Sequence, residues 1–372
     1  MPDLLIISHT EHFQTKEGII VGWEPTIREI NSLILLFDKI YHIAPLYKTR
    51  PHKANCRYIG NINFIPIPPS GGDRFIDKLM ILFFIPNNLL TIIRMINKVD
   101  WIHFRSPTNL GLYVLPLLSL LRKKKKWVKY AGNWKQKDIP VSYALQRWWL
   151  RNNFQNSIVT INGIWKKQPK HLVSFFNPCI NDDELKEANS IGYAKKFNFP
   201  IKICFVGRLD QNKGYLRLIK VLETISSVPW IDKINFVGGS ENDHFPNTTI
   251  DNNKINFCGW LNREKLNNIY KKSHFIILPT SSEGFPKVLA EAGAFGCIPI
   301  VSNLSPVNQI IINDYNGFLL FDLSIDSIRD CLLQIPIKKN QLKGMSKNII
   351  NISSQFTYRK YTEAINRAIV NA

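Results

Sequence analysis

The sequence predicts an α/β protein with two doubly wound domains, and two observations carry that prediction. Short apolar segments of strand length alternate with longer helical segments, and this alternation stops near residue 190 and then begins again. The length of 372 residues agrees, because a domain usually holds about 100–200 residues. We therefore expect domains at residues 1–190 and 191–350, and a terminal helix within residues 351–372.

The first domain begins with an apolar run at residues 4–7 that ends in polar residues, as a buried parallel strand does. A glycine-containing loop then leads to residues 26–36, where Ile27, Ile30 and Ile34 recur at helical spacing. Further strands are expected at residues 39–44, 63–67, 101–104, 127–130, 157–161 and 172–176, and apolar helices at residues 75–96 and 110–121. Residues 182–198 are polar, which is typical of a boundary helix or linker.

The second domain repeats the design. Strands are expected at residues 201–206, 233–237, 255–258, 275–278 and 298–301, and helices at residues 215–225, 263–271 and 286–295. Strands that alternate with helices in this way form parallel sheets.

Charge is the unusual feature of the composition. The chain has 48 Lys and Arg against 28 Asp and Glu, a net charge of +20. Such an excess favours anionic partners, which include nucleic acids, anionic membranes and phosphorylated small molecules. Because the sequence contains no nucleic-acid-binding module, a non-catalytic polyanion-binding protein is the less favoured alternative.

Nothing in the sequence predicts a disulfide framework, a zinc site or a segment that enters a membrane. The six cysteines lie far apart without zinc spacing, which indicates reduced thiols in a cytoplasmic protein: Cys56, Cys179, Cys204, Cys258, Cys297 and Cys331. The N-terminus lacks the pattern of a signal peptide. Residues 79–96 contain Pro86 and Arg94, and residues 110–121 are too short for a span of about 20 residues.

The first chemical motif lies at residues 204–214. A buried strand ends at Gly207, Arg208 and Lys213 follow, and a helix begins immediately. Ligands of open α/β sheets bind beyond the carboxyl ends of the strands, where cations and helix N-termini favour anions. Arg208 and Lys213 are therefore placed to hold a diphosphate, the alternative being two solvated charges beside a turn.

The second motif lies at residues 279–296, again between a buried strand and a helix. Glu283 lies on the loop and Glu291 lies within the helix, so two carboxylates could line one site. Gly284 permits close approach of the backbone to a ligand. The alternatives are that Glu283 caps the helix and that Glu291 lies on a solvated face.

Together, the two motifs resemble those of the retaining GT-B glycosyltransferases of family 4, the group 1 type. The resemblance covers the C-terminal half well, including the turn at residues 316–319, and the N-terminal half in outline. It implies the GT-B fold, in which two Rossmann-like domains face a central cleft. The first domain would bind the acceptor, the second would bind a nucleotide sugar, and the terminal helix would cross back to the first domain.

The resemblance also implies residue roles. Arg208 and Lys213 would neutralise the diphosphate of the donor, Glu283 would hold the hydroxyls of its sugar, and Glu291 would bind the ribose. The implied donor-binding set is Gly207, Gly284, Phe285, Pro286, Val288, Leu289, Glu291, Trp260 and Leu261. The nucleotide diphosphate would leave while an acceptor hydroxyl attacks from the same face, with retention of configuration. The sequence lacks an Asp-x-Asp triplet, so no metal and no cofactor besides the nucleotide-sugar co-substrate is expected.

On the acceptor side the chain departs from the family pattern. His103 matches a histidine expected to be catalytic, while Arg105 stands where a second histidine is common. Gly22 and Trp23 replace a Gly-Gly pair, and Asn133 is a further candidate for the rim of the site. The alternative for His103 is a histidine whose hydrogen bonds are satisfied at a strand end.

The basic runs at residues 122–126 and 147–151 flank apolar surface, which is typical of contact with an anionic bilayer. We therefore expect a cytoplasmic enzyme, peripheral on the inner face of the plasma membrane. Its acceptor would be lipid-linked or an oligosaccharide of bacterial cell-surface polysaccharide or glycolipid biosynthesis, such as lipopolysaccharide or capsule. The alternatives are a solvated cationic helix end and, for the reaction, a GT-B epimerase or phosphorylase.

Overall fold

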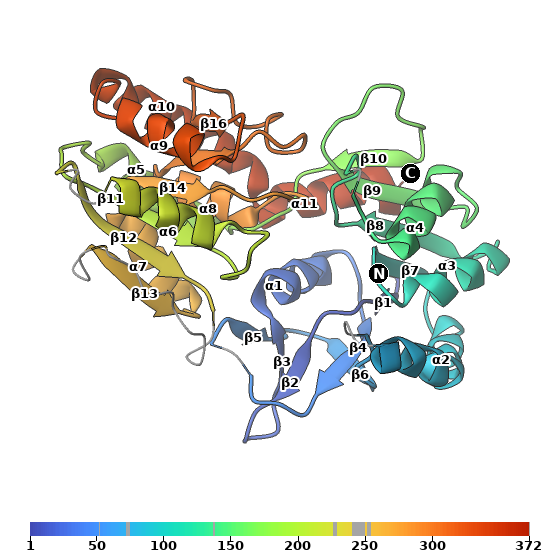
Figure 1. Ribbon diagram of the computed structural model, residues 1–372. Helices are drawn as coiled ribbons and strands as arrows, with labels where there is room; N and C mark the ends of the chain where they lie inside the picture. The colour runs from blue at the N-terminus through green and yellow to red at the C-terminus, as the bar shows by residue number, and fades with distance from the viewer. Residues whose placement is uncertain are drawn as a thin grey trace. The chain divides into compact units, whose positions relative to one another are not determined.

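The structure is a computed structural model that describes residues 1–51, 53–71, 75–136, 138–225, 229–239, 250 and 254–371. It consists of two compact units (Figure 1). Unit 1 comprises Met1–Phe176 and Arg359–Ala372, and unit 2 comprises Asn177–Tyr358. Each is a Rossmann-like α/β unit with a mainly parallel sheet, which confirms the predicted fold class.

Unit 1 contains the following elements: β1 (Leu4–Ile7), β2 (His12–Gln14), β3 (Ile20–Trp23), α1 (Glu24–Ser32), η1 (Leu33–Leu35), β4 (Ile40–Tyr47), β5 (Asn55–Arg57), β6 (Ile62–Ile67), α2 (Phe75–Ile96), β7 (Trp101–Ser106), α3 (Gly111–Leu120), β8 (Lys125–Tyr130), α4 (Val141–Arg151), β9 (Ile158–Asn162), β10 (Leu172–Phe175), α11 (Tyr358–Ile365) and a π-helical turn η3 (Asn366–Val370). The strand order is β10-β9-β8-β7-β1-β4-β2-β3-β5, and β6 pairs with β4. Strands β2, β3 and β5 form an antiparallel extension that the sequence did not predict.

The sheet of unit 1 has a core on each face. Helices α2, α3 and α4 cover one face, and α1 and α11 pack on the other (Figure 1). Side chains alternate between the faces along each strand, so Phe104 of β7 faces α3 whereas Trp101 faces α1 and α11. Because of this alternation, Arg105 and Lys129 lie on the face of the sheet that α1 covers.

Unit 2 contains α5 (Asp182–Ala194), β11 (Ile201–Val206), α6 (Tyr215–Thr224), β12 (Ile231–Val237), β13 (Ile255–Gly259), α7 (Arg263–Lys272), β14 (Phe275–Leu278), α8 (Lys287–Ala294), β15 (Ile298–Ser302), β16 (Phe318–Leu320), α9 (Ile325–Gln334), α10 (Lys339–Ser353) and η2 (Ser354–Phe356). Its sheet is parallel, in the order β13-β12-β11-β14-β15-β16. The carboxyl ends of these strands therefore meet at one edge.

The units differ in their bounds from the expected domains at 1–190, 191–350 and 351–372. Residue 190 lies inside α5, which belongs to unit 2. A capping box joins Asn181 and Glu184 at the start of this helix, and a Cβ at Gly192 would lie 2.9 Å from the amide nitrogen of Gly296. The polar composition resembled that of a linker, but close packing against α8 holds α5 in unit 2.

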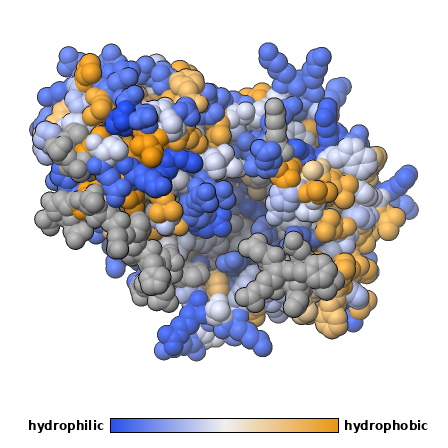
Figure 2. Space-filling model, viewed as in Figure 1, coloured by the Kyte–Doolittle hydropathy of each residue, from blue (hydrophilic) through white to orange (hydrophobic). Residues whose placement is uncertain are grey.

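The surface of unit 1 carries hydrophobic residues over α2 and α3 (Figure 2). Within the described residues, no helix combines the length and the apolar character needed to cross a membrane. The six cysteines are free thiols, as expected.

Candidate functional site

The two sequence motifs lie side by side at the carboxyl edge of the sheet of unit 2. The first follows β11 and the second follows β14, and these strands are hydrogen-bonded neighbours in which Ile203 is paired with Phe275. Because both strands run in the same direction, their loops emerge together.

The loops are held together by close backbone contacts. Gly214, the N-cap of α6, has a φ of +78°, and a Cβ there would lie 2.2 Å from the carbonyl oxygen of Pro279. The amide of Ser281 donates to the carbonyl of Asn212 at 2.8 Å, and Arg217 donates to the Pro279 carbonyl at 2.8 Å. Glycine is required at 214 both for its conformation and for this approach.

Lys213 and Glu283 form an ion pair across the two loops. Their side chains are 22% and 10% exposed, so the pair is partly shielded from water while still reachable by a ligand. Asp210 accepts a hydrogen bond from the amide of Lys213 at 2.8 Å and lies 3.3 Å from the Arg208 guanidinium. The Arg208 side chain is 71% exposed, so Lys213 is the better ordered of the two predicted cations.

Glu291 lies in a buried network instead of on a solvated face. Its carboxylate lies 2.7 Å from the Arg263 guanidinium and accepts a hydrogen bond from the Tyr270 hydroxyl at 3.2 Å. Burial and the Glu291 charge raise the pKa of Tyr270. This network orients the carboxylate, and the expected contact with ribose stays a prediction. Arg263 could not be predicted as a partner of Glu291, because the two residues are far apart along the chain.

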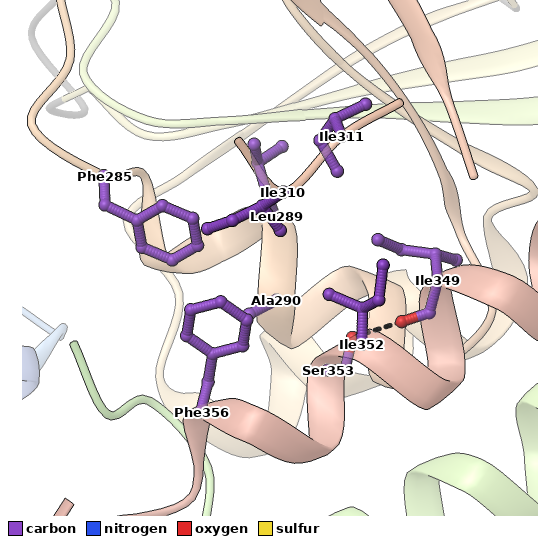
Figure 3. A pocket seen from close by; sticks show the side chains of 9 residues that line it. All are labelled: Phe285, Leu289, Ala290, Ile310, Ile311, Ile349, Ile352, Ser353 and Phe356. Atoms are coloured by element: carbon purple, nitrogen blue, oxygen red, sulfur yellow. Dashed lines mark hydrogen bonds between the residues drawn. The ribbon is translucent and has the colours of Figure 1, made fainter. Parts of the chain in front are cut away.

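Aromatic stacking supports the loop of the second motif, which contains Glu283 and Phe285. Phe285 stacks on Phe356 with ring centres 4.7 Å apart and an angle of 2° between the rings (Figure 3). Leu289 and Ile310 line the small apolar pocket beside them. Asn316 is fully buried and bonds to the backbone of residues 310 and 312, so the turn at 316–319 supports this pocket.

Other predicted donor residues surround this edge. Gly207 follows β11, Pro286 is the N-cap of α8, and Val288 packs on the core from the first turn of that helix. Trp260 and Leu261 follow β13, the outermost strand on that side.

Gly238, which the sequence analysis missed, closes the edge between β11, β12 and β13. A Cβ at Gly238 would lie 1.8 Å from the carbonyl oxygen of Gly207, and its amide donates to the Gly259 carbonyl at 2.9 Å. The Gly238-Gly239 pair directly after an apolar run was the available signal.

His103 lies in the middle of β7, not at a strand end, because this strand continues to Ser106. It is fully buried, its ring lies 3.7 Å from the Trp127 ring, and its Nδ1 is 3.2 Å from the Trp127 carbonyl oxygen. Burial and the nearby charge of Arg105 lower its pKa, so the ring is neutral. The His103 ring therefore lies in the core of unit 1, and its expected catalytic role stays a prediction.

Arg105 is likewise part of a buried network. Its guanidinium and the Lys129 ammonium each lie 2.6 Å from the same oxygen of Glu29, and Tyr361 of α11 donates to that oxygen at 3.2 Å. The Glu29 side chain is 1% exposed. Both cations depend on this one carboxylate, so Glu29 holds the Arg105 side chain inside unit 1.

Gly22 and Trp23 lie in β3 instead of in a loop, and Trp23 is the N-cap of α1. A Cβ at Gly22 would lie 2.8 Å from the His12 ring. Gly22 therefore makes room for a histidine that the sequence analysis did not consider.

His12 belongs to a buried hydrogen-bond chain whose direction is fixed. Its Nδ1 lies 2.7 Å from the Thr10 carbonyl oxygen, so Nδ1 carries the proton. Burial lowers the pKa of His12 to about 4, which leaves Nε2 as an acceptor for the Tyr58 hydroxyl at 2.6 Å. Tyr58 then accepts from Nδ1 of His42, and His42 accepts from the Ser8 hydroxyl at 2.8 Å. The donor and the acceptor of each hydrogen bond in this series are thereby fixed.

Other predicted contacts are also turned inward. The amide oxygen of Asn133 accepts from the Lys135 amide, and the residue is 9% exposed. Lys126 is buried and donates to two carbonyls at the end of α3, and Arg147 donates to two carbonyls of the loop after β8. Within the basic run 122–126, Arg122 and Lys123 are exposed.

Comparison with known proteins agrees with this geometry. The structure has the GT-B fold, as shown by its similarity to sucrose-phosphate synthase from Thermosynechococcus elongatus, with a TM-score of 0.72 and 13% identity over 100% of this chain and 99% of that one. Anabaena HepE in complex with UDP-glucose matches with a TM-score of 0.67 and 14% identity over 100% of both chains.

The sequence matches are confined to about half of the chain. Residues 192–352 match the family model "Glycosyl transferases group 1". The UDP-Gal:alpha-D-GlcNAc-diphosphoundecaprenol alpha-1,3-galactosyltransferase of Escherichia coli is 33% identical over 183 residues, 47% of this chain and 46% of that protein. An uncharacterized 41.2 kDa protein in the cps region of Klebsiella pneumoniae is 28% identical over 120 residues, 32% of each chain. The matched part of the chain thus spans less than half the length of these relatives.

Proposed function

We propose that the protein is a retaining glycosyltransferase of family 4 that moves a sugar from a nucleotide diphosphate to an acceptor hydroxyl. The observation that carries this proposal is the Lys213–Glu283 ion pair, which two interlocked loops place at the carboxyl edge of a Rossmann-like sheet. The family match of residues 192–352 covers both loops.

Lys213 and Arg208 bind the donor diphosphate, and Glu283 with the amides of Gly284 and Phe285 binds the hydroxyls of the sugar. Lys213 is paired with Glu283 before the donor arrives. Donor oxygens then share the ammonium group, so the carboxylate becomes available to the sugar. Trp260 and Leu261 contact the base in this proposal.

The chemical step depends on charge at the leaving group. As the glycosidic bond breaks, negative charge grows on the diphosphate, and preorganised cations stabilise that charge more than the ground state. Lys213 and the exposed Arg208 supply the positive charge, so the proposed reaction uses no metal ion. The acceptor hydroxyl attacks on the face from which the diphosphate departs, and a diphosphate oxygen takes its proton.

The acceptor is an oligosaccharide or a lipid-linked sugar of a bacterial cell-surface polysaccharide or glycolipid, presented at the inner face of the plasma membrane. The diphosphoundecaprenol-linked acceptor in the name of the Escherichia coli relative and the cps region of the Klebsiella relative support this. Trp23 of unit 1 is proposed to contact the acceptor, whereas the His103 side chain is buried within unit 1 and that of Arg105 pairs with the buried Glu29.

Two measurements test the proposal. A thermal-shift screen with UDP-, GDP- and ADP-sugars should identify one donor that raises the melting temperature. With that donor, nucleotide diphosphate should be released only when an acceptor is present. Release that requires phosphate, or conversion of the sugar without release, would indicate the alternative phosphorylase or epimerase.

A further inference from the structure

The outer surface of the helical layer of unit 1 is apolar where a solvent-facing layer is normally polar. Helix α2 exposes Met80, Phe83, Leu90 and Ile93, with exposed fractions of 41%, 74%, 54% and 44%. These residues recur every three to seven positions, so they share one side of the helix. The same helix buries Ile92 against the core, so it is apolar on both sides.

The two neighbouring helices continue this surface. Helix α3 exposes Leu112 and Leu120, eight residues apart, and α4 exposes Val141, Leu145 and Trp148 at helical spacing. Contacts join α2 to α3 and α3 to α4, and the three helices lie on one side of the sheet (Figure 1). We call the exposed apolar residues of α2, α3 and α4 the helical face, and hydrophobic side chains gather there in Figure 2.

Cations border the helical face at the C-terminal ends of its helices. Arg94 lies in the last turn of α2, and Arg151 is the last residue of α4. Arg122 and Lys123 come shortly after α3. All four side chains are exposed. Lys124 donates to the carbonyl of Val99 at 2.7 Å, which fixes the basic turn beside the end of α2.

Acidic residues are nearly absent from this part of the sequence. Residues 80–181 contain 16 Lys and Arg but only Asp100 and Asp138 as acids. An apolar centre with a cationic border complements the acyl chains and phosphates of an anionic bilayer. A second copy of the chain would instead bring like charges together, and charges of equal sign repel.

We propose that the helical face is the surface by which the protein docks on an anionic lipid bilayer. Phe83, Leu90 and Trp148 enter the boundary between headgroups and acyl chains, while Arg122 and Lys123 contact lipid phosphates. The inference deepens the proposed function, because it fixes which side of unit 1 faces a lipid-linked acceptor. It is tested by binding alone, so its outcome does not depend on whether sugar transfer is observed.

The experiment is co-sedimentation of the full chain with vesicles of phosphatidylcholine, alone or mixed with phosphatidylglycerol. The wild type should bind the mixed vesicles at least about tenfold more tightly than phosphatidylcholine alone. The variant Phe83→Gln/Leu90→Gln should lose at least about tenfold in affinity. The variant Arg122→Gln/Lys123→Gln should lose roughly thirtyfold, and only on the mixed vesicles.

The matched control is Phe321→Gln/Ile337→Gln, which removes two exposed apolar side chains from unit 2. It should bind as the wild type does, and all variants should keep the wild-type melting temperature, since the changed side chains are exposed. Equal binding by the wild type and Phe83→Gln/Leu90→Gln would overturn the proposal. So would a wild-type dimer in light scattering that this variant converts to a monomer, because the helical face would then join two copies.

Discussion

Lys213 shows how one side chain connects the two motifs. Its amide is fixed by Asp210, and its ammonium reaches Glu283 on the neighbouring loop. The sequence predicted both residues and their strands, since an apolar run that ends in glycine and charge has a local signature. Their mutual pairing depends on β11 and β14 being neighbours, which no local pattern specifies.

Replacing Lys213 with alanine tests this role. We expect Lys213→Ala to lower kcat by about 10²–10³-fold, the usual loss when one preorganised charge donor is removed from a transition state. The melting temperature should change little, because the side chain is partly exposed. Initial rates of nucleotide diphosphate release measure the effect.

The control is Lys220→Ala, an exposed lysine on α6, the helix that follows Lys213. It should retain wild-type turnover. If Lys213→Ala and Lys220→Ala transfer sugar equally well, the assignment of Lys213 to the diphosphate is wrong.

The buried chain from Ser8 to His12 predicts a pH dependence of stability. Burial lowers the pKa of His12 to about 4 from 6.5, so the unfolded chain takes up a proton below pH 6.5 that the folded chain refuses. The stabilisation is complete above pH 6.5 and is lost as the pH falls towards 4. His42, whose pKa is also lowered by burial, acts in the same direction.

The free energy of unfolding should therefore fall by about 2 kcal/mol between about pH 7 and about pH 5 through His12 alone. Urea denaturation of the full chain at a series of pH values measures this slope. The variant His12→Gln should show a shallower slope, whereas His171→Gln, in the same unit but outside the chain of hydrogen bonds, should keep it. Parallel slopes for the wild type and His12→Gln would contradict the buried neutral histidine.

At the scale of elements, predictability followed length and periodicity. The strands of four or more apolar residues and the helices α1, α2, α3, α6, α7 and α8 were predicted close to their observed bounds, whereas α4 and α9 were missed. Strands β2, β3 and β5 have only three or four residues and no clear alternation, so they were missed and Gly22 was assigned to a loop. Helix α10 was missed although Leu342, Met345 and Ile349 recur at helical spacing.

Buried polar residues explain the remaining error in unit 1. Histidine and arginine in β7 were interpreted as the end of a strand, because isolated strands rarely bury such groups. The burial of Arg105 depends on Glu29, which is 76 residues away in sequence, and on Tyr361, which is 332 residues from Glu29. Partners this distant leave no local signal, so the buried network of unit 1 could not be predicted from the sequence.

The stack of Phe285 on Phe356 predicts that η2 positions the donor loop. Replacing Phe356 with leucine keeps an apolar side chain but removes the stack, which is worth about 0.5–1.5 kcal/mol. Since Glu283 and Phe285 are proposed to hold the sugar, affinity for the nucleotide sugar should fall roughly two- to tenfold, while affinity for the nucleotide diphosphate changes less. Titration calorimetry with both ligands measures the difference.

The matched control is Phe199→Leu, which removes an edge contact with Trp230 away from the second loop. It should leave both affinities unchanged. An equal loss for the nucleotide sugar and the nucleotide diphosphate in Phe356→Leu would show general damage to unit 2 and contradict the positioning role.

At the scale of the whole molecule, the chain passes between the units twice. It leaves unit 1 after Phe176 and returns at Arg359. Within unit 2 the two passages are paired, since Cys179 donates to the Phe356 carbonyl and Tyr358 donates to the Ile180 carbonyl. Residues from both ends of the sequence therefore pack together in the core of unit 1.

Removing residues 359–372 should therefore destabilise unit 1. Tyr361, Ile365 and Ile369 are buried in the core beneath α1, and Tyr361 also bonds to Glu29. Burial of a large apolar side chain contributes about 1.5–3 kcal/mol, so the loss of three should cost more than about 4 kcal/mol. Urea denaturation should show a lower midpoint for the transition of unit 1.

The point variant Tyr361→Phe separates the hydrogen bond from the packing. It should cost about 1 kcal/mol, because it removes one donor to Glu29 but keeps the ring. Nucleotide diphosphate should still raise the melting temperature of this variant, since its proposed site lies in unit 2. A truncated chain as stable as the full chain would show that residues 359–372 are not part of the core of unit 1, whatever their sequence pattern indicates.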